Sequence, residues 1–431
     1  MKTKPRYPLS SLAAACVLAS FLPAQSASAA PLDHIGTVFY IYMENHNWTQ
    51  PNGNVNTSPT SGIEQIKGNP AAPFINGLVD PHSPFAADVS YTNNCYNVLA
   101  TPSGNNPSIH PSEPNYIWQE GGSNFGVTGD ADPYLDTTDA SGNVFNLPNI
   151  SGLVQKAGIS WKSYQEDIDL VPASGTVNHP GSNSLTSTVA PRDQWTVPLS
   201  SISGTSAGYT NPYNSSQQYN FAPKHCGELF FTTTNGGTTT VGDFSTSNPE
   251  VPHYRPLQEL ERDLDHNKVA KFNVITPDQY NDMHTGLSGG FTYNGIHYTG
   301  DAANISQGDN FLRTVVPMIM ASEAYKHNGL IVIWNDETEQ QNSADLTAND
   351  TSHSIMEIFI SPLAKGSAYH NDSITYTHST DVETLQEIFP IGPKQGQPFI
   401  GQTTQDATGN RDYSDLFMDH SDRDDSDHDH D

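Results

Sequence analysis

The feature that most constrains the fold of this chain is a series of short segments that are apolar at nearly every position. They lie at residues 35–43 (IGTVFYIYM), 271–275 (KFNVI) and 330–334 (LIVIW), with a fourth candidate at 356–360. A segment that is apolar throughout, rather than at every second residue, predicts a strand buried on both faces of a sheet. These segments therefore predict the central strands of a sheet that is covered on both sides.

Helical patterns lie between these strand candidates. Residues 256–269 are charged and amphipathic, and residues 311–327 carry apolar side chains at helical spacing. Pro317 is expected to kink the second helix, and Gly329 is a suitable residue to end it. Two helices are therefore predicted between the strand candidates or directly before them.

A third helix is predicted near the end of the chain. Thr380 and Glu383 have the spacing of a capping box, which opens a helix over residues 382–389. Strands that alternate with helices in this way imply right-handed crossovers and a largely parallel sheet. The predicted fold class is α/β, with helices on both faces of the sheet.

The first residues predict a cleaved secretory signal peptide over residues 1–30. Lys2, Lys4 and Arg6 form a basic start, an apolar stretch follows, and small residues at 27–29 offer a cleavage site. The alternative, a short membrane anchor, is disfavoured because the apolar stretch is too short to span a bilayer. With no later apolar stretch of roughly eighteen residues, we expect a secreted or periplasmic protein without an integral membrane segment.

The remainder is predicted to form a single domain over residues 31–400. Residues from about 170 to 220 are rich in Ser, Thr, Gly, Pro and Asn, and form a long surface insertion in this interpretation. The insertion is either a lid or substrate wall, or a plain surface excursion. Residues 401–431 are acidic and rich in His and Asp near their end, which predicts a disordered tail.

Charge and cysteine content narrow the possible partners and the compartment. The chain has 47 Asp+Glu against 18 Lys+Arg, a formal net charge of −29. Such a balance argues against binding to nucleic acid, which needs a basic surface. Cys16 leaves with the signal peptide, and in an oxidising compartment the remaining Cys95 and Cys226 are expected to form one disulfide. The oligomeric state is not determined by these features.

Acidic residues follow three of the strand candidates directly. Glu44 and Asn45 follow the first strand, and Asp336 and Glu337 follow the strand at 330–334. A further set follows the strand at 271–275 and consists of Asp278, Asp282 and His284. In an open α/β sheet the carboxyl ends of the strands meet at one edge, where ligands bind.

A single acidic residue at such a place is usually a solvated loop acid or a helix cap. Carboxylates that converge from separate strands repel one another unless a cation lies between them. The sequence therefore predicts a site for one or two divalent metal ions of unknown identity.

A nucleophile candidate lies in the segment at 110–116 (HPSEPNY). Its two prolines make a stiff turn, and a helix could begin near Tyr116. A serine such as Ser112, at a helix N-terminus and beside a metal ion, has its alkoxide stabilised by the helix dipole and the cation. The alternative is that Ser112 only caps the helix.

Together these segments resemble the secreted phosphoesterase family that contains bacterial and fungal acid phosphatases and bacterial phospholipases C. That family belongs to the wider alkaline-phosphatase-like superfamily. The matching segments follow the order of the family and are MENH at 43–46, HPSEPNY at 110–116, ITPDQYNDMH at 275–284 and LIVIWNDETE at 330–339. The resemblance implies a three-layer α/β/α sandwich, a divalent metal ion and a small phosphorylated substrate.

The resemblance also implies a role for individual residues. The implied metal ligands and contacts are Glu44, Asn45, Asp336 and Glu337. Ser112 matches the nucleophile that becomes phosphorylated, and Asn115 would hold the phosphate oxygens. His284 and His378 would contact the phosphoryl group or protonate the leaving oxygen. Weaker candidates for the same pocket are His110, Asp282 and His225.

The implied function is hydrolysis of phosphate monoesters through a phosphoserine intermediate, as in acid phosphatases. One alternative is a phosphodiesterase of the phospholipase C type that acts on lipid headgroups; another is a secreted metal-binding protein without catalysis. Sulfatases of the superfamily need a Cys or Ser followed four residues later by Arg. Tyr116 stands at that position after Ser112, so a sulfatase is not expected.

Overall fold

The computed structural model describes residues 31–51, 62–97, 110–133, 144–170, 197, 199, 201–239, 245–339, 351–405 and 412–419. The predicted signal peptide and the last residues of the acidic tail lie outside these ranges. Within them, the helices are too short or too polar to cross a membrane.

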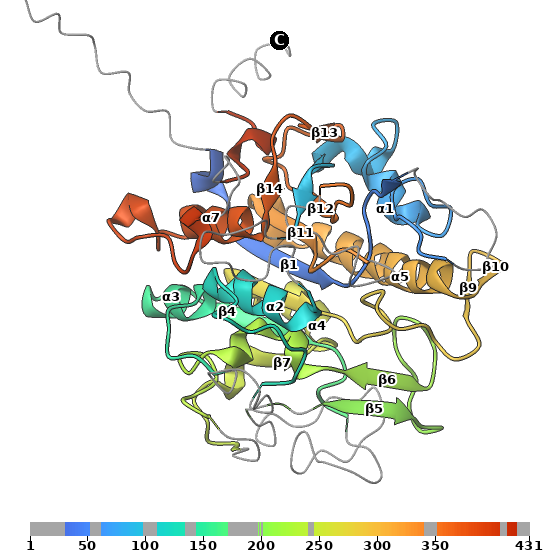
Figure 1. The fold of residues 1–431 in the computed structure, drawn as a ribbon, viewed down its shortest axis with the longest axis horizontal. Coiled ribbons are helices and arrows are strands. Elements are labelled where there is room, and N and C mark those ends of the chain that lie inside the picture. Colours follow the sequence, from blue (N-terminus) through green and yellow to red (C-terminus); the bar gives the residue numbers. More distant parts are fainter. Residues whose placement is uncertain are drawn as a thin grey trace, which may run out of the picture.

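An eight-stranded sheet with the order β13-β2-β12-β11-β1-β8-β4-β7 forms the centre of the molecule (Figure 1). Its strands are β1 (Thr37–Met43), β2 (Val89–Thr92), β4 (Trp161–Gln165), β7 (Tyr254–Pro256), β8 (Phe272–Thr276), β11 (Gly329–Asn335), β12 (Glu357–Ile360) and β13 (Tyr369–His370). Neighbouring strands are parallel, except that β12 is antiparallel to both β11 and β2. The predicted, largely parallel sheet is confirmed, and its fourth predicted strand is the antiparallel one.

Short two-stranded pairs accompany the central sheet. They are β3 (Cys95–Tyr96) with β14 (Tyr376–Thr377), β5 (Ile202–Thr205) with β6 (Gln218–Phe221), and β9 (Phe291–Tyr293) with β10 (Ile296–Tyr298). The β5–β6 pair lies at the end of the molecule opposite β13 (Figure 1). This pair belongs to the predicted insertion, and because Tyr209 and Asn211 between its strands are fully buried, this part is packed into the domain.

Helices cover both faces of the sheet. They are α1 (Pro73–Leu78), α2 (Ser112–Gly121), α3 (Ile150–Lys156), α4 (Glu259–Asp265), α5 (Asp301–Met320), α6 (Glu323–Lys326) and α7 (His378–Ile388). Successive side chains of β1 point to opposite faces of the sheet. Val38, Tyr40 and Tyr42 belong to the core shared with α2, α3 and α7. Phe39, Ile41 and Met43 belong to the core shared with α1, α4 and α5. The three-layer α/β/α arrangement explains why β1 is apolar at every position.

The helix boundaries differ from the predicted ones. The helix predicted at 311–327 begins at Asp301 and ends at Met320, and Gly329 starts β11. Its first half was not predicted because buried polar residues such as Gln307 and Asp309 interrupt the apolar period. Pro317 lies in the last turn, where the carbonyl groups have few remaining partners within the helix.

Two other helices also differ from the sequence prediction. The helix predicted at 256–269 covers only Glu259–Asp265, because Pro256 belongs to β7. The capping box of α7 consists of Thr377 and Thr380 rather than Thr380 and Glu383, so the helix begins earlier than predicted.

The predicted disulfide is wrong, because Cys95 and Cys226 are both free and buried. The Sγ atom of Cys95 lies 3.5 Å from the hydroxyl of Tyr413. The Sγ atom of Cys226 lies 3.2 Å from a carboxylate oxygen of Glu228 and 3.8 Å from the hydroxyl of Ser163. Each thiol therefore packs in a separate polar environment within the core.

The tail predicted at 401–431 is not disordered throughout. In its described part, Tyr413, Leu416 and Phe417 are buried, and Phe417 pairs with Ala364 in a β-bridge. These apolar side chains bind the segment to the domain despite the acidic residues around them.

Candidate active site

The carboxyl ends of β1, β8 and β11 bring three acidic segments together. Met43 and Asn335 are paired in the parallel register of β1 and β11, so the residues that follow them meet at one edge of the sheet. The backbone N–H of Asn45 donates to Oδ1 of Asp336 at 2.9 Å. The backbone N–H of Glu44 donates to the carbonyl oxygen of Asp282, also at 2.9 Å. The parallel topology thus gathers residues that are distant in the sequence.

Ser112 is directed at this acidic group from the first residue of α2. Its hydroxyl donates to Oε2 of Glu44 at 3.2 Å and to Oε1 of Glu337 at 3.3 Å. The alternative role as a helix cap does not apply, since Pro111 occupies the N-cap position. Asn115, one turn later, donates to Oε2 of Glu337 at 3.3 Å. The N-terminus of α2, with its partial positive charge, therefore points toward the carboxylates.

The carboxylates of this group are buried close to one another. Burial raises the pKa of Glu44 well above its ordinary value, with further contributions from Asp336, Asp282 and Glu337. Burial, followed by the charge of Glu337, raises the pKa of Asp336 to about 7. Oδ2 of Asp336 is buried and accepts no hydrogen bond from the described residues. Repelling carboxylates with an unused buried oxygen fit a divalent cation.

His225 is more central than the sequence indicated. Its Nε2 lies 3.1 Å from Oε1 of Glu44, and its Nδ1 lies 3.5 Å from Oδ2 of Asp282. The ring stacks on Tyr116 with a centroid distance of 4.9 Å. Burial, with a further contribution from the charge of Lys224, lowers the pKa of His225. The imidazole therefore bridges the carboxylates that follow β1 and β8.

His110 and His284 lie at the border of the acidic group. Nδ1 of His110 is 2.8 Å from Oε2 of Glu337. Nδ1 of His284 lies 3.0 Å from the hydroxyl of Thr285, and its ring centroid is 6.2 Å from that of His225. Burial lowers the pKa of His284 to about 4. These two histidines are near the site without a hydrogen bond to Ser112 among the described contacts.

Both ring nitrogens of His378 contact groups other than Ser112, which differs from the contact with the phosphoryl group that the resemblance implies. Trp334 donates its Nε1–H to Nδ1 of His378 at 3.0 Å, so Nε2 carries the proton and donates to the backbone carbonyl oxygen of Asp336. The ring is fully buried, and burial lowers its pKa to about 4. Because both ring nitrogens are engaged, His378 is a positioning residue for Asp336.

Two further residues of the site were not predicted. The Tyr116 hydroxyl donates to Oε1 of Glu44 at 3.1 Å. Nζ of Lys224 lies 2.6 Å from Oδ2 of Asp130, and Asp130 raises the pKa of Lys224 although burial acts in the opposite direction. Lys224 directly precedes His225, which the sequence did indicate as a weaker candidate.

A histidine and two carboxylates form a second group beside the first. Nε2 of His46 lies 3.1 Å from Oδ1 of Asp301 and 3.8 Å from Oε2 of Glu339. Burial opposes protonation of His46, but the charge of Asp301 raises its pKa to about 9. The raised pKa favours a protonated His46 that is paired with Asp301.

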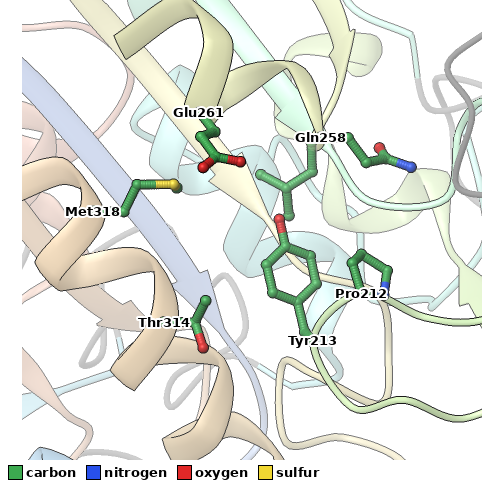
Figure 2. Close-up of a pocket in the computed structure, with 7 residues that line it drawn as sticks. Pro212, Tyr213, Gln258, Glu261, Thr314 and Met318 are labelled. Carbon is green, nitrogen blue, oxygen red and sulfur yellow. The ribbon is translucent and has the colours of Figure 1, made fainter. Parts of the chain in front are cut away.

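A surface hollow lies apart from the acidic group. It has a volume of about 390 Å³, and Figure 2 shows Tyr213, Glu261 and Met318 facing it. None of the predicted catalytic or metal-binding residues lines it. The chemistry of the chain is therefore assigned to the group around Ser112.

A comparison with protein-family models identifies the family of the chain. The model of the family described as the Phosphoesterase family matches residues 105–392, which is more than half of the chain. No match was found among curated protein sequences.

Several solved structures are similar to this chain at low sequence identity. An alkaline phosphatase superfamily protein from Vibrio parahaemolyticus is 12% identical, with a TM-score of 0.44 over 87% of this chain and 73% of that chain. The lipoteichoic acid synthase LtaP from Listeria monocytogenes is 8% identical, with a TM-score of 0.45 over 88% and 78%. The PsFucS1 sulfatase from Pseudoalteromonas sp. is 10% identical, with a TM-score of 0.46 over 89% and 72%.

Proposed function

Since this chain belongs to the phosphoesterase family and is a hydrolase of phosphate or sulfate esters, we propose that it hydrolyses phosphate monoesters with Ser112 as the nucleophile. The observation that carries the proposal is the position of the Ser112 hydroxyl, between Glu44 and Glu337 at the start of α2. The proposed enzyme is secreted and of the acid phosphatase type. The signal-peptide prediction supports secretion, and the resemblance of the segments at 110–116 and 275–284 supports the acid phosphatase type.

Glu44, Asn45, Asp336 and Glu337 would hold a divalent cation. When bound, such a cation supplies positive charge that stabilises an oxyanion of the nucleophile and of the phosphoryl group. Asn45 suits the bend after β1, because its φ of 46° lies in the left-handed region that asparagine tolerates better than most residues. Its backbone N–H then reaches Asp336.

The side chains of the site perform the remaining tasks. The Ser112 oxygen forms a bond to phosphorus as its proton passes to a carboxylate that it already contacts, and the bond from phosphorus to the leaving oxygen breaks. Asn115 donates hydrogen bonds to the transferred group. Water then hydrolyses the phosphoserine, which restores the Ser112 hydroxyl and releases phosphate.

His284 is the proposed donor of the proton that the leaving oxygen takes up. Its pKa of about 4 means that its acid form increases as the pH falls toward that value. Activity on esters with poor leaving groups is therefore expected to rise at acidic pH. Tyr116, which stands where a sulfatase would have Arg, donates to Glu44 and so supports phosphate rather than sulfate esters.

The test is hydrolysis of p-nitrophenyl phosphate by the mature chain, with and without a chelator, beside the Ser112→Ala variant. Removal of the nucleophile is expected to lower kcat on the order of 10⁴-fold or more. Ser151→Ala is a matched control, because the Ser151 hydroxyl at the start of α3 also donates to a buried glutamate, Oε1 of Glu120 at 2.7 Å. This control should change kcat only a few-fold.

Mass spectrometry of the acid-quenched reaction should find the phosphoryl group on the peptide that contains Ser112. Activity that survives both Ser112→Ala and the chelator would overturn the proposal. Hydrolysis of bis-p-nitrophenyl phosphate or phosphatidylcholine, without hydrolysis of the monoester, would replace it with a phosphodiesterase.

A further inference from the structure

A further group of buried carboxylates lies where β4 and β8 end. Glu166 and Asp167 follow β4 directly, and Asp278 follows β8. One oxygen from each side chain lies within 4.8 Å of an oxygen of the other two. The parallel pairing of β4 with β8 brings the three residues together, and the loops after these strands meet there.

These three carboxylates are deeply buried without a compensating positive charge. Glu166, Asp167 and Asp278 are 2%, 1% and 1% exposed. No ion pair joins any of them to a Lys, Arg or His side chain in the described part of the chain. Burying a charge without a partner is strongly unfavourable, so the group needs either bound protons or a cation.

The hydrogen bonds of the group leave specific oxygens unused. Glu166 accepts three hydrogen bonds, since Oε1 accepts from the side-chain amides of Asn211 and Asn281 at 2.8 Å and Oε2 accepts from the backbone N–H of Asp278 at 2.9 Å; one acceptor site remains on Oε2. Oδ1 of Asp167 accepts from the Tyr209 hydroxyl.

Oδ1 of Asp278 accepts from the backbone N–H groups of Tyr280 and Asn281. The other oxygens, Oδ2 of Asp167 and Oδ2 of Asp278, are buried and accept no hydrogen bond from described residues. Each aspartate therefore has one oxygen held by donors and one that remains available to a ligand.

We propose that Glu166, Asp167 and Asp278 bind a calcium ion that is separate from the metal site at Ser112. The ligand atoms are all carboxylate oxygens, which select a hard cation rather than zinc or copper. Calcium accepts irregular oxygen coordination at about 2.3–2.6 Å, whereas magnesium demands near-ideal octahedral geometry at about 2.0–2.1 Å, so carboxylates that neighbouring donors already hold in place favour calcium. Burial also raises the pKa of Glu166 to about 8 and that of Asp167 to about 7, so a bound cation would relieve the repulsion among the three groups.

The bound ion would connect three segments that shape the active site. Asn211 lies between β5 and β6 and donates to Glu166, and the backbone N–H of Gln279 donates to the carbonyl oxygen of Asn220 in β6. The loop after β8 continues to Asp282, whose carbonyl oxygen accepts from the backbone of Glu44. The ion would thus hold the β5–β6 insertion and the loop of Asp282 in place, whatever reaction Ser112 performs.

Binding to the second site is measured in a background where the first site is disabled. The Asp336→Asn protein is stripped with a chelator and titrated with CaCl2 by calorimetry. A parallel titration with TbCl3 follows lanthanide luminescence, which the nearby Tyr209 can sensitise. We expect one calcium ion per chain and a luminescence signal that excess calcium abolishes.

Adding Asp278→Asn to this background is expected to lower calcium affinity at least 100-fold and to remove the luminescence. Asp167→Asn should do the same, which keeps the test decisive if one of the two variants misfolds. Asp309→Asn is the control, because Asp309 is a fully buried acid in α5 outside the group, and it should leave binding unchanged.

Absence of calcium binding to the Asp336→Asn protein would overturn the proposal. Equal binding with and without Asp278→Asn would also overturn it. If Asp278→Asn or Asp167→Asn unfolds at a higher temperature than its parent and its calcium content is unchanged, the three carboxyl groups share protons rather than bind calcium, and the proposal is overturned.

Discussion

Replacing His378 by alanine tests whether this histidine takes part in the chemistry or holds the backbone at Asp336. The ring joins two buried groups, the Nε1–H of Trp334 and the carbonyl oxygen of Asp336. The alanine variant leaves both groups without a partner in a place that water does not reach. Each buried group that loses its hydrogen bond costs about 1–3 kcal/mol, so the expected loss of unfolding free energy is about 2–6 kcal/mol before the cavity is counted.

Such a loss is a large share of the total stability of a domain, which is typically about 5–15 kcal/mol. It should appear in urea unfolding as a lower midpoint with an unchanged slope. Because Asp336 is displaced, kcat is expected to fall as well. The shape of the pH dependence of kcat should stay the same, since a positioning residue does not donate the proton.

Two variants separate the positioning role from a general loss of packing. His378→Gln can still donate to the carbonyl of Asp336 and should recover part of both stability and kcat. His253→Ala is the matched control: His253 also stacks on a tryptophan, Trp161, and contacts its carbonyl oxygen at 2.8 Å, but lies away from Ser112. It should lower stability by only about 1 kcal/mol and leave kcat unchanged. A His378→Ala protein of normal stability that has lost the acidic limb of its pH profile would refute the positioning role.

Two further predictions concern buried positions in α5 that are not among the proposed metal ligands. Burial raises the pKa of Asp309 to about 6. The folded state therefore holds this proton more tightly, and the group lowers the unfolding free energy by about 3 kcal/mol as the pH rises through this range. In Asp309→Asn this contribution is absent, so urea unfolding at about pH 4 and pH 7 should show the variant gaining about 2 kcal/mol relative to the parent at the higher pH; a constant difference would contradict it. In Gly308→Ala the new Cβ would lie 2.3 Å from Cγ of Met283, in the loop that carries His284. Overpacking should lower stability by about 1–3 kcal/mol and reduce kcat, whereas Gly77→Ala, whose Cβ meets only an ordinary contact at 3.8 Å, should do neither.

The central strands could be predicted from the sequence because they are buried on both faces and therefore carry apolar or aromatic residues at nearly every position. In β1, successive side chains enter opposite cores, so no polar residue is tolerated between Thr37 and Met43. The acidic residues directly after β1 and β11 could be grouped for a related reason. Adjacent parallel strands end at the same edge, so Glu44 and Asp336 meet wherever those two strands are neighbours.

Other features were not predictable because they depend on contacts between residues that are distant in the sequence. The first half of α5 is rich in polar residues that are buried by partners elsewhere: Asp309, for example, accepts from the backbone of Phe74 and Ile75. The direction of β12 relative to β11 and β2 is set by the tertiary structure, since the apolar pattern of a strand is the same whether it runs parallel or antiparallel to its neighbours. The free state of the two cysteines is likewise a consequence of where their strands and turns lie.

The sequence alone determined the layered α/β fold and the place of the acidic residues at the strand ends, because apolar periodicity and strand ends are local properties. Only the tertiary structure decided what each polar side chain contacts. His378 looked equivalent to His284 in the sequence, but its ring is held between Trp334 and Asp336. Asp278 looked like a ligand of the first metal site, but it lies with Glu166 in a separate group. The physical reason is that a buried polar group must find a partner, and that partner can come from any part of the chain.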